Sequence, residues 1–203
     1  MIIVFSLTYI MASQADDVKD FQIAEMSVRD SLLNYFDENL ILEELNSKYT
    51  FFYKNKTYAI VTAGDSNEFP LRINTGMYED IGITIKPNDK KFIIYGLSGR
   101  IFCKEDINYC KSKKKEINND LKDFFGKNIK IENADQDHAY DKTGRSKSFN
   151  TYYIFESGDH ITVATYDWHP DAKNQDGISF PDNTKVIIST KEFEKFLSEV
   201  QYN

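Results

Sequence analysis

Short turn sequences between runs of strand-forming residues restrict the fold of this chain more than any other feature. Each turn contains residues that favour a tight reversal, and the runs beside it are rich in β-branched and aromatic residues. The turns are Asn55-Lys56, Pro87-Asn88-Asp89 and Ser157-Gly158-Asp159. The paired runs are 50–54 with 57–62, 80–86 with 91–95, and 149–156 with 160–167. Because hairpins pair strands antiparallel and no regular βαβ alternation is present, the sequence predicts an antiparallel sheet with helices on one face.

Helical periodicity marks further regions of the chain. Apolar residues recur at helical spacing over 28–36 and again over 41–45, which predicts a helical hairpin. A long helix is predicted over 105–125, and a last helix begins at Ser189 or Thr190, after a strand over 185–189. The predicted fold is therefore α+β: an antiparallel sheet built from hairpins, with an N-terminal helical hairpin, one long central helix and a C-terminal helix packed on it. The stretches 134–147 and 168–183 lack periodicity and are predicted to be polar loops.

The N-terminus has the pattern of a secretion signal. Residues 2–11 carry no charge and are too few to cross a bilayer as a helix, which suits the apolar region of a signal peptide. Ser13 and Ala15 supply the small side chains that a signal peptidase requires. We therefore expect a signal peptide over 1–15, a single α+β domain over 16–203, and a periplasmic or secreted location. Since no Lys or Arg precedes the apolar run, the alternative is a cytosolic protein with a buried strand over 2–9.

The two cysteines, Cys103 and Cys110, are close enough in the sequence to form a disulfide. In an oxidising compartment such a pair usually forms the bridge. It would tie the long predicted helix to the strand before it and stabilise the fold by about 2 kcal/mol. The alternative, linked to a cytosolic location, is two unpaired thiols. A zinc site is not expected, because no second cysteine pair or nearby histidine completes a ligand set.

The composition is that of one folded, acidic domain. Of the 203 residues, 41% are apolar, which is enough for one substantial core. The formal net charge of -7 argues against nucleic acid as a partner, since nucleic-acid-binding proteins carry a basic surface. No second apolar stretch is long enough for a membrane span. The motifs of phosphate-binding loops, serine hydrolases, HExxH metalloenzymes and CxxC redox proteins are absent, so the sequence predicts no cofactor.

Aromatic residues in the two polar loops form the candidate binding site. Trp168 is the only tryptophan, and it stands at the end of a predicted strand among polar residues. Together with His169, Tyr140 and His138 it is predicted to bind a ligand or a partner, as exposed aromatic residues often do. Further candidates for this surface are Tyr152, Tyr153 and Tyr166. Strand alternation sends Tyr152 and Tyr153 to opposite faces, so at least one of them is expected in the core. The competing interpretation is that Trp168 closes one end of the core.

Carboxylates near these aromatic residues suggest two further functions, metal binding and hydrolysis. Asp135, Asp137 and Asp141 are candidate metal ligands, because calcium prefers several oxygen ligands from a flexible loop. A hydrolase would need the histidines and nearby carboxylates to converge, namely His138, His160 or His169 with Asp137, Asp159 or Asp167. The sequence favours an exported module that binds a small molecule or a protein. The alternative is an exported metal-dependent or histidine-based hydrolase.

Overall fold

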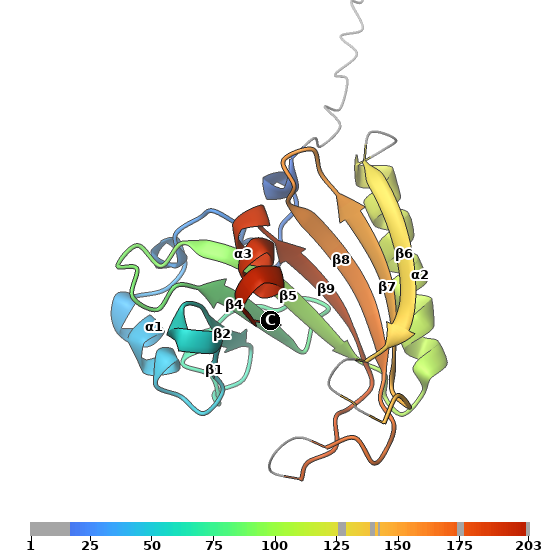
Figure 1. Cartoon of the computed structure of the whole chain (residues 1–203). Coiled ribbons are helices and arrows are strands. Elements are labelled where there is room, and N and C mark those ends of the chain that lie inside the picture. The colour runs from blue at the N-terminus through green and yellow to red at the C-terminus, as the bar shows by residue number, and fades with distance from the viewer. Residues whose placement is uncertain (1–16, 126–128, 139–140, 142, 174–176, 202–203) are drawn as a thin grey trace, which may run out of the picture.

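One strongly curved sheet organises the chain (Figure 1). The computed structural model describes residues 17–125, 129–138, 141, 143–173 and 177–201, and among these residues nine strands join the sheet. Eight follow the order β1-β2-β4-β5-β9-β8-β7-β6, all antiparallel, and β3 pairs with β2 in parallel. The strands are β1 Phe51–Phe52, β2 Ala59–Gly64, β3 Leu71–Arg72, β4 Asp80–Ile85, β5 Ile94–Phe102, β6 Lys130–Asp137, β7 Lys147–Ile154, β8 His160–Asp167 and β9 Asn183–Ser189.

The three hairpins predicted from turn chemistry are confirmed. β1 pairs with β2, β4 with β5, and β7 with β8, each across one of the predicted turns. Gly158, in the last of these turns, has a φ of 85°, a conformation that favours glycine. The sequence did not predict β6, whose last residues fall in the stretch expected to be a polar loop. β6 is an edge strand with mostly exposed side chains, so it lacks the alternation that reveals a strand.

The hydrophobic core lies between one face of the sheet and the helices α1 (Glu38–Leu45) and α2 (Ile107–Phe125). The long central helix is thus confirmed, and it packs against β8 and β9. Strand alternation sends aliphatic side chains to this face, including Leu97, Val163 and Val186. The predicted Cys103–Cys110 disulfide is present, with the two Cα atoms 5.0 Å apart. Both cysteines are buried, so the bridge fastens the first turn of α2 beneath the end of β5.

The N-terminal helical hairpin differs from the prediction in its first half. Its second helix is α1, but the first is only a 3-10 turn at Leu32–Asn34. Part of the backbone of this segment bonds to the first residue of β5 and to the chain just before it. The amides of Arg29 and Leu32 donate to the carbonyls of Ile94 and Phe92, at 2.8 and 2.9 Å. These tertiary hydrogen bonds replace the helical ones, while the apolar side chains of the segment are still buried as their spacing predicts.

The C-terminal helix packs on the sheet, but on the face opposite α2 (Figure 1). α3 (Lys191–Phe196) continues into a π-helical turn at Leu197–Gln201. Its two phenylalanines form a second cluster with Tyr58, separate from the main core. Glu194 of α3 lies 3.3 Å from His160, which alternates with a core residue on β8 and so points away from α2. The expectation that all helices share one face is therefore wrong for α3.

Within the described residues, no helix is both long and apolar enough to cross a membrane. The predicted signal peptide over 1–15 lies outside the described residues, and so does Tyr140.

Candidate functional site

Polar, small and aromatic side chains line the sheet face that α2 does not cover, which we call the polar face. One row of successive cross-strand partners on this face consists of Asp80, Arg100, Lys185, Ala164, Asn150 and Ala134. The next row consists of Phe102, Asn183, Tyr166 and Ser148. The same strands send aliphatic residues to the other face, so their alternation separates a packed core from a polar surface.

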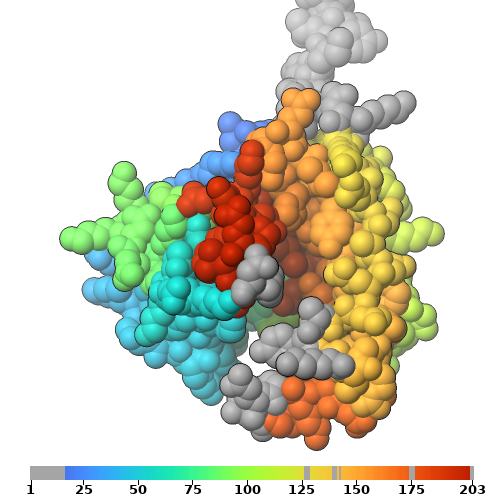
Figure 2. Space-filling view, in the orientation of Figure 1, coloured from blue at the N-terminus to red at the C-terminus, as the bar shows by residue number. Residues whose placement is uncertain are grey.

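The polar face lies at the bottom of a hollow. Figure 2 shows the molecular surface hollowed between α3 and the β6–β7 edge of the sheet, with β9 behind the opening. Two short side chains, Ala164 and Thr162, lie near Lys185 on the polar face, and both are buried. The hollow is a partly enclosed space with aromatic residues at one end, and small-molecule sites are commonly concave spaces that combine aromatic side chains with a few polar groups.

An aromatic cluster closes one end of the polar face. It consists of His138, Tyr166, Trp168 and Phe180, which come from the segment after β6, from β8, and from the segment between β8 and β9. The His138 ring centroid lies 3.9 Å from that of Trp168 and 5.2 Å from that of Tyr166. Trp168 also stacks on Phe180 at 4.4 Å. All four side chains are half-buried, so they combine fixed positions with accessible ring surface.

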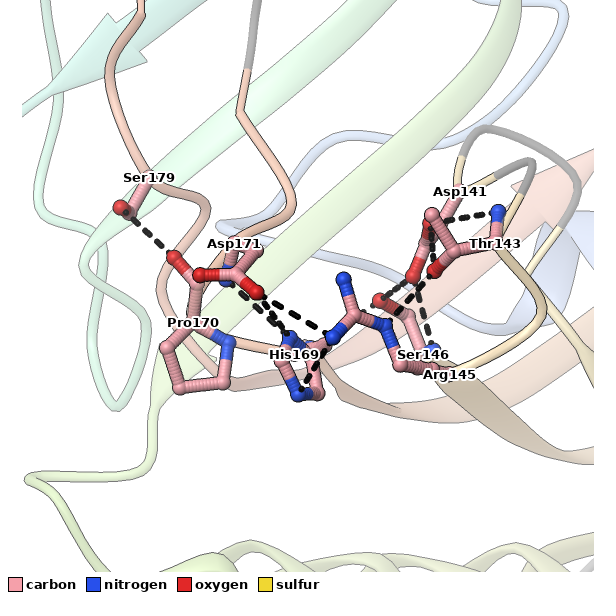
Figure 3. A network of polar contacts seen from close by, with 8 residues as sticks. All are labelled: Asp141, Thr143, Arg145, Ser146, His169, Pro170, Asp171 and Ser179. Carbon is pink, nitrogen blue, oxygen red and sulfur yellow. Dashed lines mark hydrogen bonds and ion pairs between the residues drawn. The ribbon is translucent and has the colours of Figure 1, made fainter.

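Hydrogen bonds on both sides fix the backbone of Trp168. Its amide donates to Asp182 Oδ1 at 2.7 Å, and the following amide, that of His169, donates to Ser146 Oγ at 3.0 Å. Burial raises the pKa of Asp182, although the hydrogen bond from Trp168 acts in the opposite direction. Ser146 is fully buried, and its hydroxyl donates to Asp141 at 2.6 Å (Figure 3). The backbone at Trp168 is therefore held in place by the fold itself, and a group fixed in this way loses little entropy when it makes a contact.

The His169 ring belongs to a surface network and is not part of the aromatic cluster. Its Nε2 lies 3.4 Å from Arg145, and its Nδ1 lies 3.6 Å from Asp171 (Figure 3). Arg145 and Asp171 are themselves paired at 3.2 Å. Of the residues predicted to bind a ligand, the structure thus brings Trp168 and His138 together and turns the His169 side chain elsewhere.

Two of the three aspartates predicted as metal ligands make other contacts, and the third is exposed. Asp141 accepts hydrogen bonds from the hydroxyls and amides of Thr143 and Ser146, which hold its pKa well below the ordinary value. Asp137 pairs with Lys147 at 2.5 Å, and Asp135 is exposed on β6. In the part of the chain that the structure describes, no three His, Cys, Asp or Glu side chains are grouped to hold a metal ion.

Lys185 carries the unbalanced charge of the polar face. Its neighbour Arg100 is paired with Asp80, to which Arg100 Nε donates at 3.0 Å and Nη2 makes a second contact. The Lys185 ammonium lies 5.9 Å from the centroid of the Tyr166 ring, and the described residues offer it no hydrogen bond or ion pair. Removal from water lowers the pKa of Lys185, and Arg100 lowers it further, while Asp80 acts in the opposite direction.

The charge of Lys185 also affects the pKa of His138 in the aromatic cluster. Burial lowers the pKa of His138, and the charge of Lys185 lowers it further, against a weaker opposite effect of Asp141. The lowered pKa favours the neutral form of His138 at neutral pH, so the aromatic cluster adds no further cation to the polar face.

The three histidines do not form one cluster. His160 pairs with Glu194 at 3.3 Å, at the start of β8, whereas His138 packs against Tyr166 near the end of that strand. Six residues of strand separate His160 from Tyr166, a distance of roughly 20 Å. The convergence of all three histidines that a shared catalytic site would need is therefore not found.

A separate depression of about 500 Å³ lies between α3, the β7–β8 turn and the N-terminal segment. The buried carboxylate in its lining, that of Asp159, is engaged by neighbouring groups. Asp159 accepts hydrogen bonds from Arg29 at 2.5 Å, from Ser157 at 2.8 Å and from the amide of Lys191 at 2.8 Å. Burial alone would raise the pKa of Asp159, but these hydrogen bonds outweigh it and hold the pKa below the ordinary value. We assign this network a structural role, because it joins three distant segments of the chain.

Comparison with models of known protein families, with curated proteins and with solved structures found no match for this chain. Its function is therefore inferred from the geometry of the hollow.

Sequence reasoning missed Arg100, Asn183, Lys185 and Phe180. Their grouping depends on strand register, which pairs β5 and β8 with β9. One signal was available in the sequence: Asn183 and Lys185 are polar residues at alternate positions of a strand otherwise rich in Val and Ile. A lysine within a buried strand is uncommon and indicates a polar surface on one side of the sheet.

Proposed function

We propose that this chain is an exported binding protein whose ligand is a small organic molecule held in the hollow over the polar face. The observation that carries the proposal is the aromatic cluster at the end of the hollow. Trp168 is fixed through its own amide and the next one, yet its ring remains half-exposed beside Tyr166 and His138. A rigid aromatic surface next to a polar-lined space provides both stacking and orientation for a ligand.

The proposal also places the protein outside the cytoplasm, as an exported protein. The Cys103–Cys110 disulfide supports it, since structural disulfides persist mainly in oxidising compartments. The apolar segment predicted as a signal peptide supports it independently. The intact mass of the protein recovered from a secreting bacterial host tests this part. A chain that begins at Asp16 is expected, and a full-length chain with two alkylatable thiols would contradict export.

Fluorescence of the protein tests the binding function directly, because Trp168 is the only tryptophan. We expect titration with a panel of small aromatic compounds, neutral and acidic, to change its emission saturably. Binding measured by calorimetry should weaken about tenfold or more in Trp168→Ala, since a buried aromatic contact contributes at least that much.

Phe51→Ala is the matched control, because Phe51 is 50% exposed and lies on the edge strand β1. It should bind as the unmodified protein does, and both variants should keep the same circular dichroism spectrum. A panel without any saturable binder would refute the proposed function. A Trp168→Ala protein that fails to fold would show that Trp168 closes the core.

A further inference from the structure

The polar face contains a positive charge that the described residues do not neutralise. Arg100 and Lys185 are cross-strand partners, and the Asp80 carboxylate beside them is engaged by Arg100. The row therefore holds two cations and one anion, a local excess of one positive charge. The whole chain has a formal net charge of -7, so this excess runs against the general field of the protein. A hollow that holds a positive charge in an otherwise negatively charged protein is suited to attract an anion.

The neighbouring position on β9 points to a ligand by an independent observation. Asn183 is 5% exposed, and its amide nitrogen donates to the Pro181 carbonyl at 2.8 Å. Its Oδ1 atom is buried and has no hydrogen-bond partner among the described residues. A buried acceptor without a donor costs free energy, and such groups are rare in folded proteins. Asn183 shares the polar face with Lys185, roughly 7 Å along the strand.

The Lys185 ammonium and the Asn183 Oδ1 atom could be engaged together by a single ligand. The Lys185 ammonium lacks an acceptor with negative charge, and the Asn183 oxygen lacks a donor. Tyr166 pairs with Asn183 across the strands and lies beneath the Lys185 ammonium, and its ring centroid is 6.4 Å from that of Trp168. The charged end and the aromatic end of the hollow are therefore adjacent parts of one surface.

We infer that the ligand is a small aromatic carboxylic acid that also carries a hydroxyl or amino donor. Its carboxylate binds the Lys185 ammonium, its donor group binds Asn183 Oδ1, and its ring stacks in the aromatic cluster at Trp168. This inference rests on the proposed function, and it adds the charge and the class of the ligand. The acid is bound by charge and stacking, with no covalent step.

A matched pair of probes separates charge from shape. Isothermal titration calorimetry is performed with 4-hydroxyphenylacetate and with its neutral amide, 4-hydroxyphenylacetamide. We expect the acid to bind at least about tenfold more tightly than the amide, because a charge-assisted hydrogen bond discriminates by roughly that factor. Lys185→Met should remove this preference by weakening the acid while leaving the amide unchanged, and Lys185→Gln should do the same.

Lys111→Met is the control variant for the loss of one lysine. Lys111 is exposed on α2 and also lies over an aromatic ring, that of Phe149 at 4.9 Å, but it is not on the polar face. It should keep the full preference for the acid. Equal affinity of the unmodified protein for acid and amide would overturn the anion inference and leave the proposed function standing. Binding of neither probe, nor of any compound in the wider panel, would overturn both.

Discussion

Replacing Lys185 by methionine should make the folded protein more stable, which is the opposite of what a structural residue shows. The methionine keeps most of the unbranched stem that lies against Tyr166 and removes the ammonium. The ammonium has no hydrogen bond or ion pair among the described residues, and Arg100 stands directly across from it. Like charges at such a cross-strand position are destabilising.

The size of the effect follows from two opposing contributions. Replacing buried charged groups by apolar side chains of similar volume is often neutral or stabilises a protein by about 1–4 kcal/mol. Loss of the contact with the Tyr166 ring costs about 0.5–1 kcal/mol. Lys185 is half-buried and attracted by Asp80, which places the first contribution at its lower end. We expect a net gain of about 1 kcal/mol, or roughly 2–4 °C in the melting temperature of a domain of this size.

Urea denaturation followed by circular dichroism measures this difference, provided that the dependence on urea concentration is the same in both proteins. The gain in stability from Lys185→Met should become smaller as the pH rises toward the ordinary pKa of lysine. Because the pKa of Lys185 is lowered in the folded state, the unfolded chain binds more protons between that pKa and the ordinary value. The unmodified protein therefore becomes more stable as pH rises through this interval, and the advantage of Lys185→Met shrinks. A loss of 1 kcal/mol or more at neutral pH would show that the lysine supports the fold.

Three further predictions concern groups that hold the fold and the site together. Ser146→Ala should lower the free energy of unfolding by about 1–2 kcal/mol and shift the tryptophan emission, because two hydrogen bonds of the Ser146 hydroxyl are lost; unchanged emission would contradict its role. Glu44→Gln should raise stability at neutral pH by about 1 kcal/mol, since burial raises the pKa of Glu44 while the bond to the Thr62 amide can be kept. This gain should disappear in acid, where Glu44 is protonated in both states, and a urea titration across pH measures it. Replacing Cys103 and Cys110 by serine should cost about 2 kcal/mol in the same assay, and a smaller loss than about 0.5 kcal/mol would show that the bridge adds little.

The parts of the fold that were predictable are those determined by local chemistry. The turn at Ser157-Gly158-Asp159 and the apolar stripe of α2 depend on neighbouring residues, and both are found where the sequence predicts them. The 3-10 turn at Leu32–Asn34 was not predictable, because hydrogen bonds to β5 compete with the helix. β6 was missed because an exposed edge strand leaves no hydrophobic pattern.

The candidate site was predictable only through its most conspicuous member. Trp168 attracts notice as a lone tryptophan among polar residues, and His138 lies beside it in the structure. Lys185 and Arg100 become neighbours through the pairing of β5 with β9, strands far apart in the sequence. Long-range register of this kind is set by the whole core, and no local pattern around Lys185 contains it.

Comparison with Glu44 shows why Lys185 indicates a ligand. Both are ionisable groups that folding removes from water, and Glu44 Oε2 has no hydrogen-bond partner among the described residues. Glu44, however, has a structural task, because its other oxygen accepts the Thr62 amide at 3.1 Å in β2. Lys185 has no such task in the described residues, and it lies on the polar face over the half-buried ring of Tyr166. Glu44→Gln and Lys185→Met should therefore both raise stability at neutral pH, while only Lys185→Met should lose the preference for a carboxylic acid. If both variants bind the acid equally well, the charge of Lys185 is a defect of the fold rather than a binding group.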